Sequence, residues 1–313
     1  MTYSIVSFHP HDGSLGFAAQ SHFFAVGSVV GDAEAGVGVV VSQAFANTDW
    51  PHEGLSLLRA GATPDDVLEA LIAGDPLADY RQAIVMDATG AYACFTGGSC
   101  APHTGVARGE GVAAAGNMLA SDEVCRAMVA AHDGHGEPGD HGDPESASTH
   151  ARRLVRALLA GERAGGDARG SQSAVVKVVD GVRGERPWRH VLADIRVDDH
   201  ADPVRELRRL LPVHEGFRTI GAALFAPPLV IGDPSGIAAA DAREMVEALT
   251  AAAAGLGGNS EADLWRAVIL LRCGEFDAGG TLLAELTSAR PQLREFARGL
   301  ERVGILPRAE VRP

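Results

Sequence analysis

The chain has 313 residues, enough for about two domains and a substantial buried core. Hydrophobic residues make up 46% of it and charged residues 22%, which is typical of globular proteins and not of disordered ones. The formal net charge of −14 argues against nucleic acid or an anionic membrane as a principal partner, because both bind basic surfaces.

No apolar run reaches the roughly 18 residues that a membrane-spanning helix needs. The N-terminal sequence MTYSIVSFHP has no basic region, no long apolar stretch and no small-residue cleavage site, so we expect no signal peptide and a cytoplasmic location. The cysteines at positions 94, 100, 125 and 273 lack C-x-x-C spacing, and we expect reduced thiols.

The N-terminal part reads as strands followed by a helix. Residues 3–8 and 15–21 predict two strands, and the Pro and Asp-Gly residues in 9–13 predict the turn of a hairpin between them. A strongly β-branched strand is expected at 36–44. A helix is expected at 63–73, because Pro64 and two acids lie in its first turn and Gly-Asp-Pro follows it.

Strands and helices then continue to residue 211. Residues 133–149 are rich in Gly, Pro, Asp and His and predict a surface loop. The other expected elements are strands at 82–88, 91–96, 111–119, 173–179 and 193–197, and helices at 122–132, 150–163 and 202–211.

This order favours an α+β fold, with antiparallel sheets covered by helices, over a doubly wound parallel sheet. Residues 212–235 contain Pro and Gly and predict a linker. Residues 236–313 show only helical periodicity, with one helix–turn–helix unit that resembles a tetratricopeptide repeat. We favour packing or homo-oligomer formation as the role of this helical extension.

Several motifs occur in a characteristic order along residues 1–211. They are TYSIV (2–6), LGFAAQSHFFAVGSVV (15–30), GVGVVVSQAFAN (36–47), GLSLLRAGATPDDVLEAL (54–71), YRQAIVMDATGAYACFTG (80–97), AAGNMLA (114–120), AGGDARGSQSAVVKV (164–178) and IRVDDHADPVRELRRLL (195–211). Together they resemble the DUF1028 family, whose members resemble N-terminal-nucleophile hydrolases. The resemblance implies a four-layer αββα sandwich of antiparallel sheets and names no substrate. This chain departs from the family at His9-Pro10, where an Asp-Pro turn is usual, and in a longer 133–149 loop.

Thr2 is the candidate nucleophile. Removal of the initiator Met would place a free α-amine and a β-hydroxyl on this residue. The α-amine has an unperturbed pKa of about 7.7–8.0, so it can accept the hydroxyl proton as Oγ attacks a carbonyl. The alternative is an inert terminus, because many proteins begin Met-Thr.

Attack on a carbonyl also needs donors for the oxyanion that forms. Candidates are Gly97, Gly98 and the backbone near Asp167, and above all Asn117, which follows an apolar strand and a glycine. The alternative for each glycine pair is a tight turn.

The segment 165–173 is the densest polar cluster of the chain. Its glycines let the backbone approach a ligand, and Arg169 can pair with a substrate carboxylate. The alternative is an internal ion pair between Arg169 and Asp167 or the acids at 198–199. The remaining expected substrate-binding residues are Asp167, Gln172, Ser173, Asp198 and His200, with Ser21 and Gln43. The last two are included because their strands are expected beside the first one.

Asp198, Asp199 and His200 follow a strand and carry the donor atoms of a cation site. Neighbours on a strand alternate faces, however, so helix capping and ion pairing are the reading we favour. A histidine cluster of His9, His11 and His22 is a second metal alternative. We expect neither a metal nor a cofactor.

Three functions stay open. The first is a hydrolase that cleaves an amide-like C–N bond of a small molecule, with Thr2, Asn117 and Asp199 as catalytic residues. The second is a metal- or acid/base-dependent hydrolase that uses Asp167, Asp198, Asp199 and His200. The third is a non-catalytic binding or assembly protein that acts through its C-terminal helices.

Overall fold

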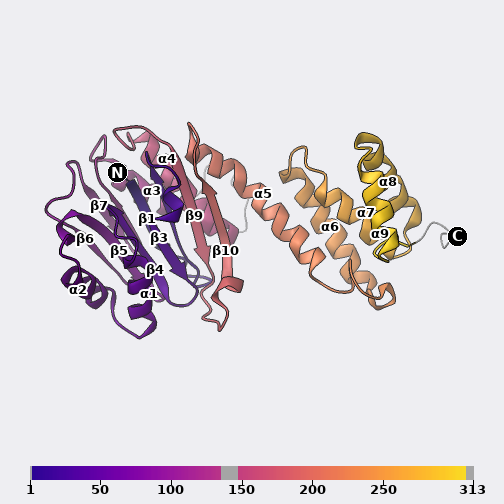
Figure 1. The fold of residues 1–313 in the computed structure, drawn as a ribbon, viewed down its shortest axis with the longest axis horizontal. Helices are drawn as coiled ribbons and strands as arrows, with labels where there is room; N and C mark the ends of the chain where they lie inside the picture. Colours follow the sequence, from indigo (N-terminus) through magenta and orange to yellow (C-terminus); the bar gives the residue numbers. More distant parts are fainter. Residues whose placement is uncertain (1, 135–146, 308–313) are drawn as a thin grey trace. The chain divides into compact units, whose positions relative to one another are not determined.

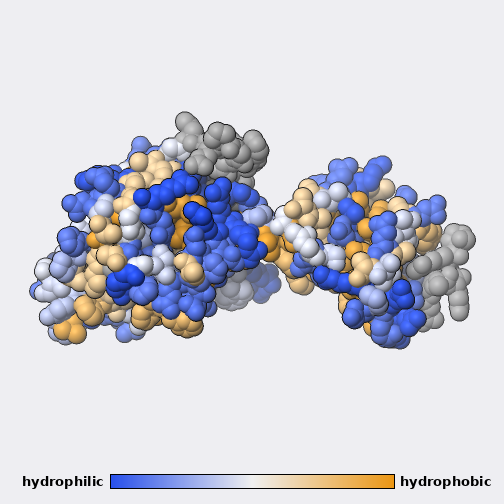
Figure 2. All heavy atoms as spheres, turned by 90° about the horizontal axis from the view of Figure 1, so that it is seen from above, coloured by the Kyte–Doolittle hydropathy of each residue, from blue (hydrophilic) through white to orange (hydrophobic). Residues whose placement is uncertain are grey.

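The computed structural model describes residues 2–134 and 147–307, which form two units, Met1–Leu211 and Pro212–Pro313. Most of the predicted loop 133–149 therefore lies outside the described residues. Helix α5 (Pro203–Leu224) crosses the boundary between the units. Hydrophilic residues and smaller hydrophobic patches are interspersed on the face shown in Figure 2. None of the described helices is both long and apolar enough to span a membrane.

The first unit contains a six-stranded antiparallel sheet in the order β10-β9-β2-β1-β8-β7. Its labelled strands β10, β9, β1 and β7 follow one another across the view of Figure 1. The predicted N-terminal hairpin is present, with Thr2 opposite Ser21 and Phe8 opposite Leu15. The strands are β1 (Thr2–Phe8), β2 (Leu15–Ser21), β7 (Gly105–Gly109), β8 (Val112–Gly116), β9 (Ser173–Val179) and β10 (Val191–Val197).

A second antiparallel sheet has four strands in the order β3-β4-β5-β6. Its strands are β3 (Gly31–Glu34), β4 (Gly38–Ala44), β5 (Arg81–Asp87) and β6 (Tyr92–Thr96). The edge strands β3 and β7 were not expected from the sequence. Both are short, and their sequences GDAE and GVARG lack the run of β-branched residues that makes central strands recognisable.

Three apolar clusters hold the two sheets and their helices together. One joins the sheets through residues such as Val6, Phe17 and Ile84. A second lies under α3 (Val124–Asp133) and α4 (Ala147–Arg163), which cover the outer face of the larger sheet. A third lies under α1 (Trp50–Arg59) and α2 (Pro64–Gly74) on the smaller sheet. The expected α+β class with antiparallel sheets is confirmed.

The space between the sheets changes character along the strands. On β1, Val6 faces the apolar centre, while Ser4 and Thr2, two and four residues earlier on the same face, are polar. On β5, the inward-facing Met86 and Ile84 are apolar, whereas Gln82, two residues before Ile84 near the start of the strand, is polar. The interface is therefore apolar in its middle and polar at the end where Thr2 lies.

The predicted linker at 212–235 is wrong for its first half, because α5 continues through Pro212 to Leu224. Proline removes one backbone hydrogen bond, but Leu211, Ile220 and Ala223 on the same helix are buried and favour its continuation. Short 3₁₀ helices lie at η1 (Val26–Ser28), η2 (Ala78–Tyr80), η3 (Pro187–His190) and η4 (Pro234–Gly236).

The second unit is helical where it is described. Its core contains Leu249, Trp265 and Val268, and the buried Arg272 donates hydrogen bonds to backbone carbonyls that include those of Leu229 and Ile305. The resemblance to a tetratricopeptide repeat stays a prediction. The helices are α6 (Ala239–Gly255), α7 (Glu261–Arg272), α8 (Phe276–Ala289) and α9 (Leu293–Arg302).

Candidate functional site

A pocket of about 400 Å³ opens at the polar end of the two sheets. Its polar lining includes Thr2, Ser21 and Gln43, with Ser42, Thr48 and Arg81, and its apolar walls include Phe23, Val30 and Phe45. Its volume is in the range that small-molecule sites occupy. The pocket thus brings together three of the residues that the sequence selected.

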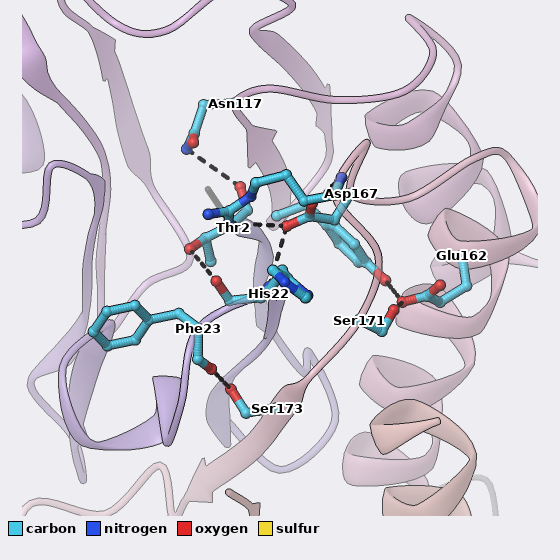
Figure 3. Close-up of polar contacts among 11 residues, drawn as sticks. Thr2, His22, Phe23, Asn117, Glu162, Asp167, Ser171 and Ser173 are labelled. Carbon is cyan, nitrogen blue, oxygen red and sulfur yellow. Dashed lines mark hydrogen bonds and ion pairs between the residues drawn. The ribbon is translucent and has the colours of Figure 1, made fainter. Parts of the chain in front are cut away.

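Thr2 is held firmly at the start of β1. Its side chain is buried among neighbours, with 7% of the residue exposed, and Oγ1 donates to Ser21 Oγ at 3.2 Å (Figure 3). Its carbonyl oxygen accepts from the backbone N–H of Asn117 at 3.2 Å and from Asn117 Nδ2 at 3.3 Å. The backbone at Thr2 is therefore fixed on one side while its hydroxyl borders the pocket.

A chain of buried amides supports this arrangement. Gln82 Nε2 donates to the carbonyl oxygen of Gly116 at 3.0 Å, and since a carbonyl only accepts, this contact fixes the orientation of the Gln82 amide. Gln82 Oε1 then accepts from Gln43 Nε2 at 2.8 Å and from Asn117 Nδ2 at 3.2 Å. Gln43 Oε1 in turn accepts from Ser4 Oγ at 2.7 Å.

These orientations determine which amide has an N–H group left to donate to a ligand. Asn117 Nδ2 directs its two hydrogens at Thr2 O and Gln82 Oε1, so it positions Thr2 and has none left for an oxyanion. Gln43 Nε2 uses one hydrogen for Gln82, and its second has no acceptor among the described residues. Because Gln43 is a lining residue of the pocket, its amide is the candidate donor for a ligand there.

The amino-acid sequence of the chain matches a known family of proteins. The profile described as a family of unknown function (DUF1028) matches residues 2–207, about two thirds of the chain. The chain belongs to the DUF1028 family. A crystal structure of a DUF1028 protein from Silicibacter pomeroyi is similar, with 31% sequence identity and a TM-score of 0.56 over 67% of this chain and 84% of that one. None of the curated proteins compared with the chain matches it significantly.

The 165–173 segment of this DUF1028 protein contacts the backbone of residues 22 and 23 next to the pocket. The buried carboxylate of Asp167 accepts from the backbone N–H of His22 at 3.1 Å and of Arg169 at 2.8 Å. Arg169 Nη2 lies 3.3 Å from Asp167 Oδ2, which is the internal ion pair that the sequence left open. Ser173 Oγ donates to the carbonyl of Phe23 at 2.5 Å and so holds a wall of the pocket (Figure 3).

The remaining residues of the polar segments lie on the surface. Asp198, Asp199 and His200 are exposed, and none of them lines the pocket. Asp199 accepts from Gln172 Nε2 at 3.3 Å, and His200 Nδ1 accepts from the backbone of Asp202 at 3.0 Å, near the start of α5. Among residues 2–134 and 147–307, no three His, Cys, Asp or Glu side chains are placed to hold a metal ion.

Gly97 and Gly98 form a turn apart from the pocket lining. A Cβ added at Gly97 would lie 2.2 Å from the backbone oxygen of Asp79, so the glycine is needed for close backbone packing. A Cβ added at Gly98 would meet nothing within 4 Å. The tight-turn reading therefore describes this pair.

His9 lies at the far end of β1 from Thr2, in the turn after Phe8. There its ring stacks on the buried His150 with ring centroids 5.5 Å apart, and its Nδ1 lies 2.9 Å from Asp12 Oδ1. Burial first, and then the charges of His132 and His9, hold the pKa of His150 well below its ordinary value. His9 and His11 thus lie at the end of β1 away from Thr2, whereas His22, the third member of the predicted cluster, follows Ser21 at the Thr2 end, so the three do not come together.

Backbone strain gathers around Thr2. Ala44, which lines the pocket, has φ of 68°, and Ala25, between two pocket residues, has φ of 53°. Met118, directly after Asn117, has φ of 47°. These are three of the four described non-glycine residues with positive φ, a conformation that costs on the order of 1 kcal/mol or more each. Such strain is concentrated at functional sites.

Sequence reasoning missed Gln82, the centre of the amide chain, and the aromatic walls Phe23 and Phe45. Gln82 carried a usable signal, because it is a polar residue on the inward-facing set of an otherwise apolar strand. Gln43 was expected on a strand beside β1, but β4 belongs to the other sheet and reaches Ser4 across the interface.

Proposed function

We propose that this protein is a hydrolase of amide-like C–N bonds, in which Thr2 is the nucleophile after removal of Met1. The observation that carries the proposal is the position of the Thr2 hydroxyl, which borders a ligand-sized pocket at the start of a buried strand. The order of layers, two facing sheets with helices on the outside of each, resembles the sandwich of N-terminal-nucleophile hydrolases. This resemblance supports the proposal. Met1 itself lies outside the described residues.

The chemistry requires a base next to the nucleophile. The free α-amine of Thr2 takes the hydroxyl proton while Oγ1 forms a bond to the amide carbonyl carbon. The C–N bond then breaks, the departing amine receives that proton, and an ester on Thr2 remains. A water molecule cleaves the ester, releases the acid and restores the hydroxyl. An α-amine with a pKa near 8 is suited to both proton transfers near neutral pH.

Gln43 is the side chain best placed to stabilise the oxyanion. Its amide is held by Ser4 and Gln82 so that one N–H remains for a ligand in the pocket. Loss of one oxyanion donor typically lowers kcat by about 100- to 1,000-fold. We therefore expect Gln43→Met to lower kcat by about this factor with a smaller effect on KM.

Intact-mass spectrometry and acylation test the nucleophile directly. The purified protein should lack the mass of Met1, and a small β-lactone should add its whole mass once, because ring opening by Oγ1 releases no leaving group. Thr2→Ala should abolish labelling, Thr2→Ser should retain it, and Thr104→Ala, an exposed threonine of the same unit, should leave it unchanged. Retention of Met1, or labelling that survives Thr2→Ala, would refute the mechanism.

A further inference from the structure

The pocket beside Thr2 has a marked chemical asymmetry. Thr2, Ser21 and Gln43 belong to its polar lining, together with Ser42, Thr48 and Arg81, and the other lining residues are aliphatic or aromatic. Phe23 and Phe45, which belong to these walls, are 55% and 57% exposed. Large aromatic side chains left open around a concave site favour an apolar ligand, because binding removes their surface from water.

The ring of Phe45 and the backbone at Phe23 are held in place. The ring of Phe45 packs edge-on against Tyr80, with ring centroids 6.0 Å apart. The backbone around Phe23 is fixed by Ser173, which donates to the Phe23 carbonyl at 2.5 Å and accepts from the Val26 N–H at 3.0 Å. Walls that are already ordered lose little conformational entropy when a ligand binds.

Among the described residues, no side chain that lines the pocket carries an uncompensated charge for an ionic ligand. Arg81 is the charged residue among its described lining residues, and its Nε lies 3.0 Å from Asp75 Oδ2 while its Nη1 donates to the Phe45 carbonyl. The Arg81 and Asp75 side chains are 13% and 7% exposed, so the pair is shielded from water. Arg169, which the sequence offered as a carboxylate anchor, is paired with Asp167 and is not a lining residue.

Desolvating a carboxylate without a side-chain cation to pair with it is unfavourable, and the Thr2 α-amine must be neutral when it acts as the base. The net charge of −14 adds a repulsion for anions. We infer that the substrate is an uncharged amide whose acyl part carries an aromatic or branched aliphatic group, which lies between Phe23 and Phe45 while its carbonyl faces Thr2 and Gln43. This inference rests on the proposed function for the orientation of the carbonyl. It makes the two phenylalanines specificity-determining residues.

Binding to the Thr2→Ala protein tests the inference without turnover. Titration calorimetry should show that phenylacetamide binds at least about tenfold more tightly than succinamate, a primary amide that carries a carboxylate in place of an apolar group. Phe23→Ala or Phe45→Ala, each added to Thr2→Ala, should weaken phenylacetamide binding by about 3- to 10-fold. Phe24→Ala is the matched control, because Phe24 is 62% exposed but does not line the pocket. Equal or tighter binding of succinamate, or no effect of Phe23→Ala and Phe45→Ala, would overturn the inference.

Ammonia release by the unmutated protein separates this inference from the hydrolase proposal. Phenylacetamide that binds as expected but is never hydrolysed would refute the hydrolase and leave the ligand class standing. Hydrolysis of succinamate in preference to phenylacetamide, lost in Thr2→Ala, would uphold the hydrolase and overturn the ligand class. Preferential, Thr2-dependent hydrolysis of phenylacetamide would support both.

Discussion

Replacing Gln82 with methionine keeps the size of a fully buried side chain and removes its amide. The amide accepts hydrogen bonds from Gln43 and Asn117 on its oxygen and donates to Gly116 and Thr96 from its nitrogen. The substitution therefore leaves two side-chain N–H groups without their acceptor inside the protein. It also releases the amide of Asn117, which holds the carbonyl of Thr2.

The expected magnitude follows from the number of stranded groups. Each buried donor left without a partner costs about 1–3 kcal/mol, so the two amides together lower the free energy of unfolding by about 2–6 kcal/mol. A typical domain has a total stability of about 5–15 kcal/mol. The variant should therefore still fold at 25 °C, with a clearly lower urea midpoint of unfolding. Its kcat should also fall in the folded state, because Thr2 and Gln43 both lose their support.

Gln20→Met is the matched control. Gln20 is as deeply buried as Gln82, but neither atom of its amide has a hydrogen-bond partner among the described residues. The same substitution there should be neutral or stabilising, because it removes an unpaired polar group. Urea unfolding followed by tryptophan fluorescence measures both, with the buried Trp50 as a reporter in the same unit. Equal midpoints for the two variants would refute the amide chain as the support of the pocket.

Three further outcomes are expected. Burial lowers the pKa of His132 to about 4 and, together with neighbouring charges, holds that of His150 well below its ordinary value. Because the unfolded chain takes up these protons near pH 6.5, stability should fall as the pH drops from about 6.5 to about 4, by about 3 kcal/mol for His132 alone. Urea midpoints across this range, compared with those of His132→Leu, measure the effect, and parallel curves for the two proteins would contradict it. Gly97→Ala should lower the free energy of unfolding by about 1–3 kcal/mol or more, because its methyl group meets a backbone oxygen, whereas Gly98→Ala should leave the thermal midpoint unchanged. Asp167→Asn should cost about 1–3 kcal/mol, because neither orientation of the amide accepts all three of the present hydrogen bonds, and an unchanged thermal midpoint would argue against them.

Local pattern was sufficient for most of the fold. Elements were predicted at nearly their observed places from the turn residues between β1 and β2, from the Pro and acids in the first turn of α2, and from the apolar run of β9. The short edge strands β3 and β7 were missed because their sequences carry little β-branched signal. The length of α5 was missed because a proline is a strong local sign of a helix end, and burial further along the helix outweighs it.

The site was harder to predict than the fold, because its contacts join residues that are distant in sequence. Thr2 and Ser21 were found together, since a hairpin places them opposite each other. Gln43 was selected on the wrong geometry, and Gln82 was not selected, because no local pattern shows that β4 and β5 face β1 across an interface. Asp198, Asp199 and His200 attracted attention through their side-chain chemistry, yet they lie on the exposed segment before α5.

Polar side chains between two sheets lower stability unless every buried polar atom finds a hydrogen-bond partner. Apolar residues such as Val6 and Ile84 join them elsewhere without any polar group to satisfy. At the Thr2 end the amides of Gln43, Gln82 and Asn117 bond to one another, but Asn117 Oδ1 has no hydrogen-bond partner among the described residues. The nearby Ala25 and Ala44 also adopt strained backbone conformations. Buried polar groups and backbone strain both lower stability, and such features are found where a functional side chain must be held in one position. What these contacts fix is the carbonyl of Thr2 and the amide of Gln43, the two groups that a nucleophile at this position requires.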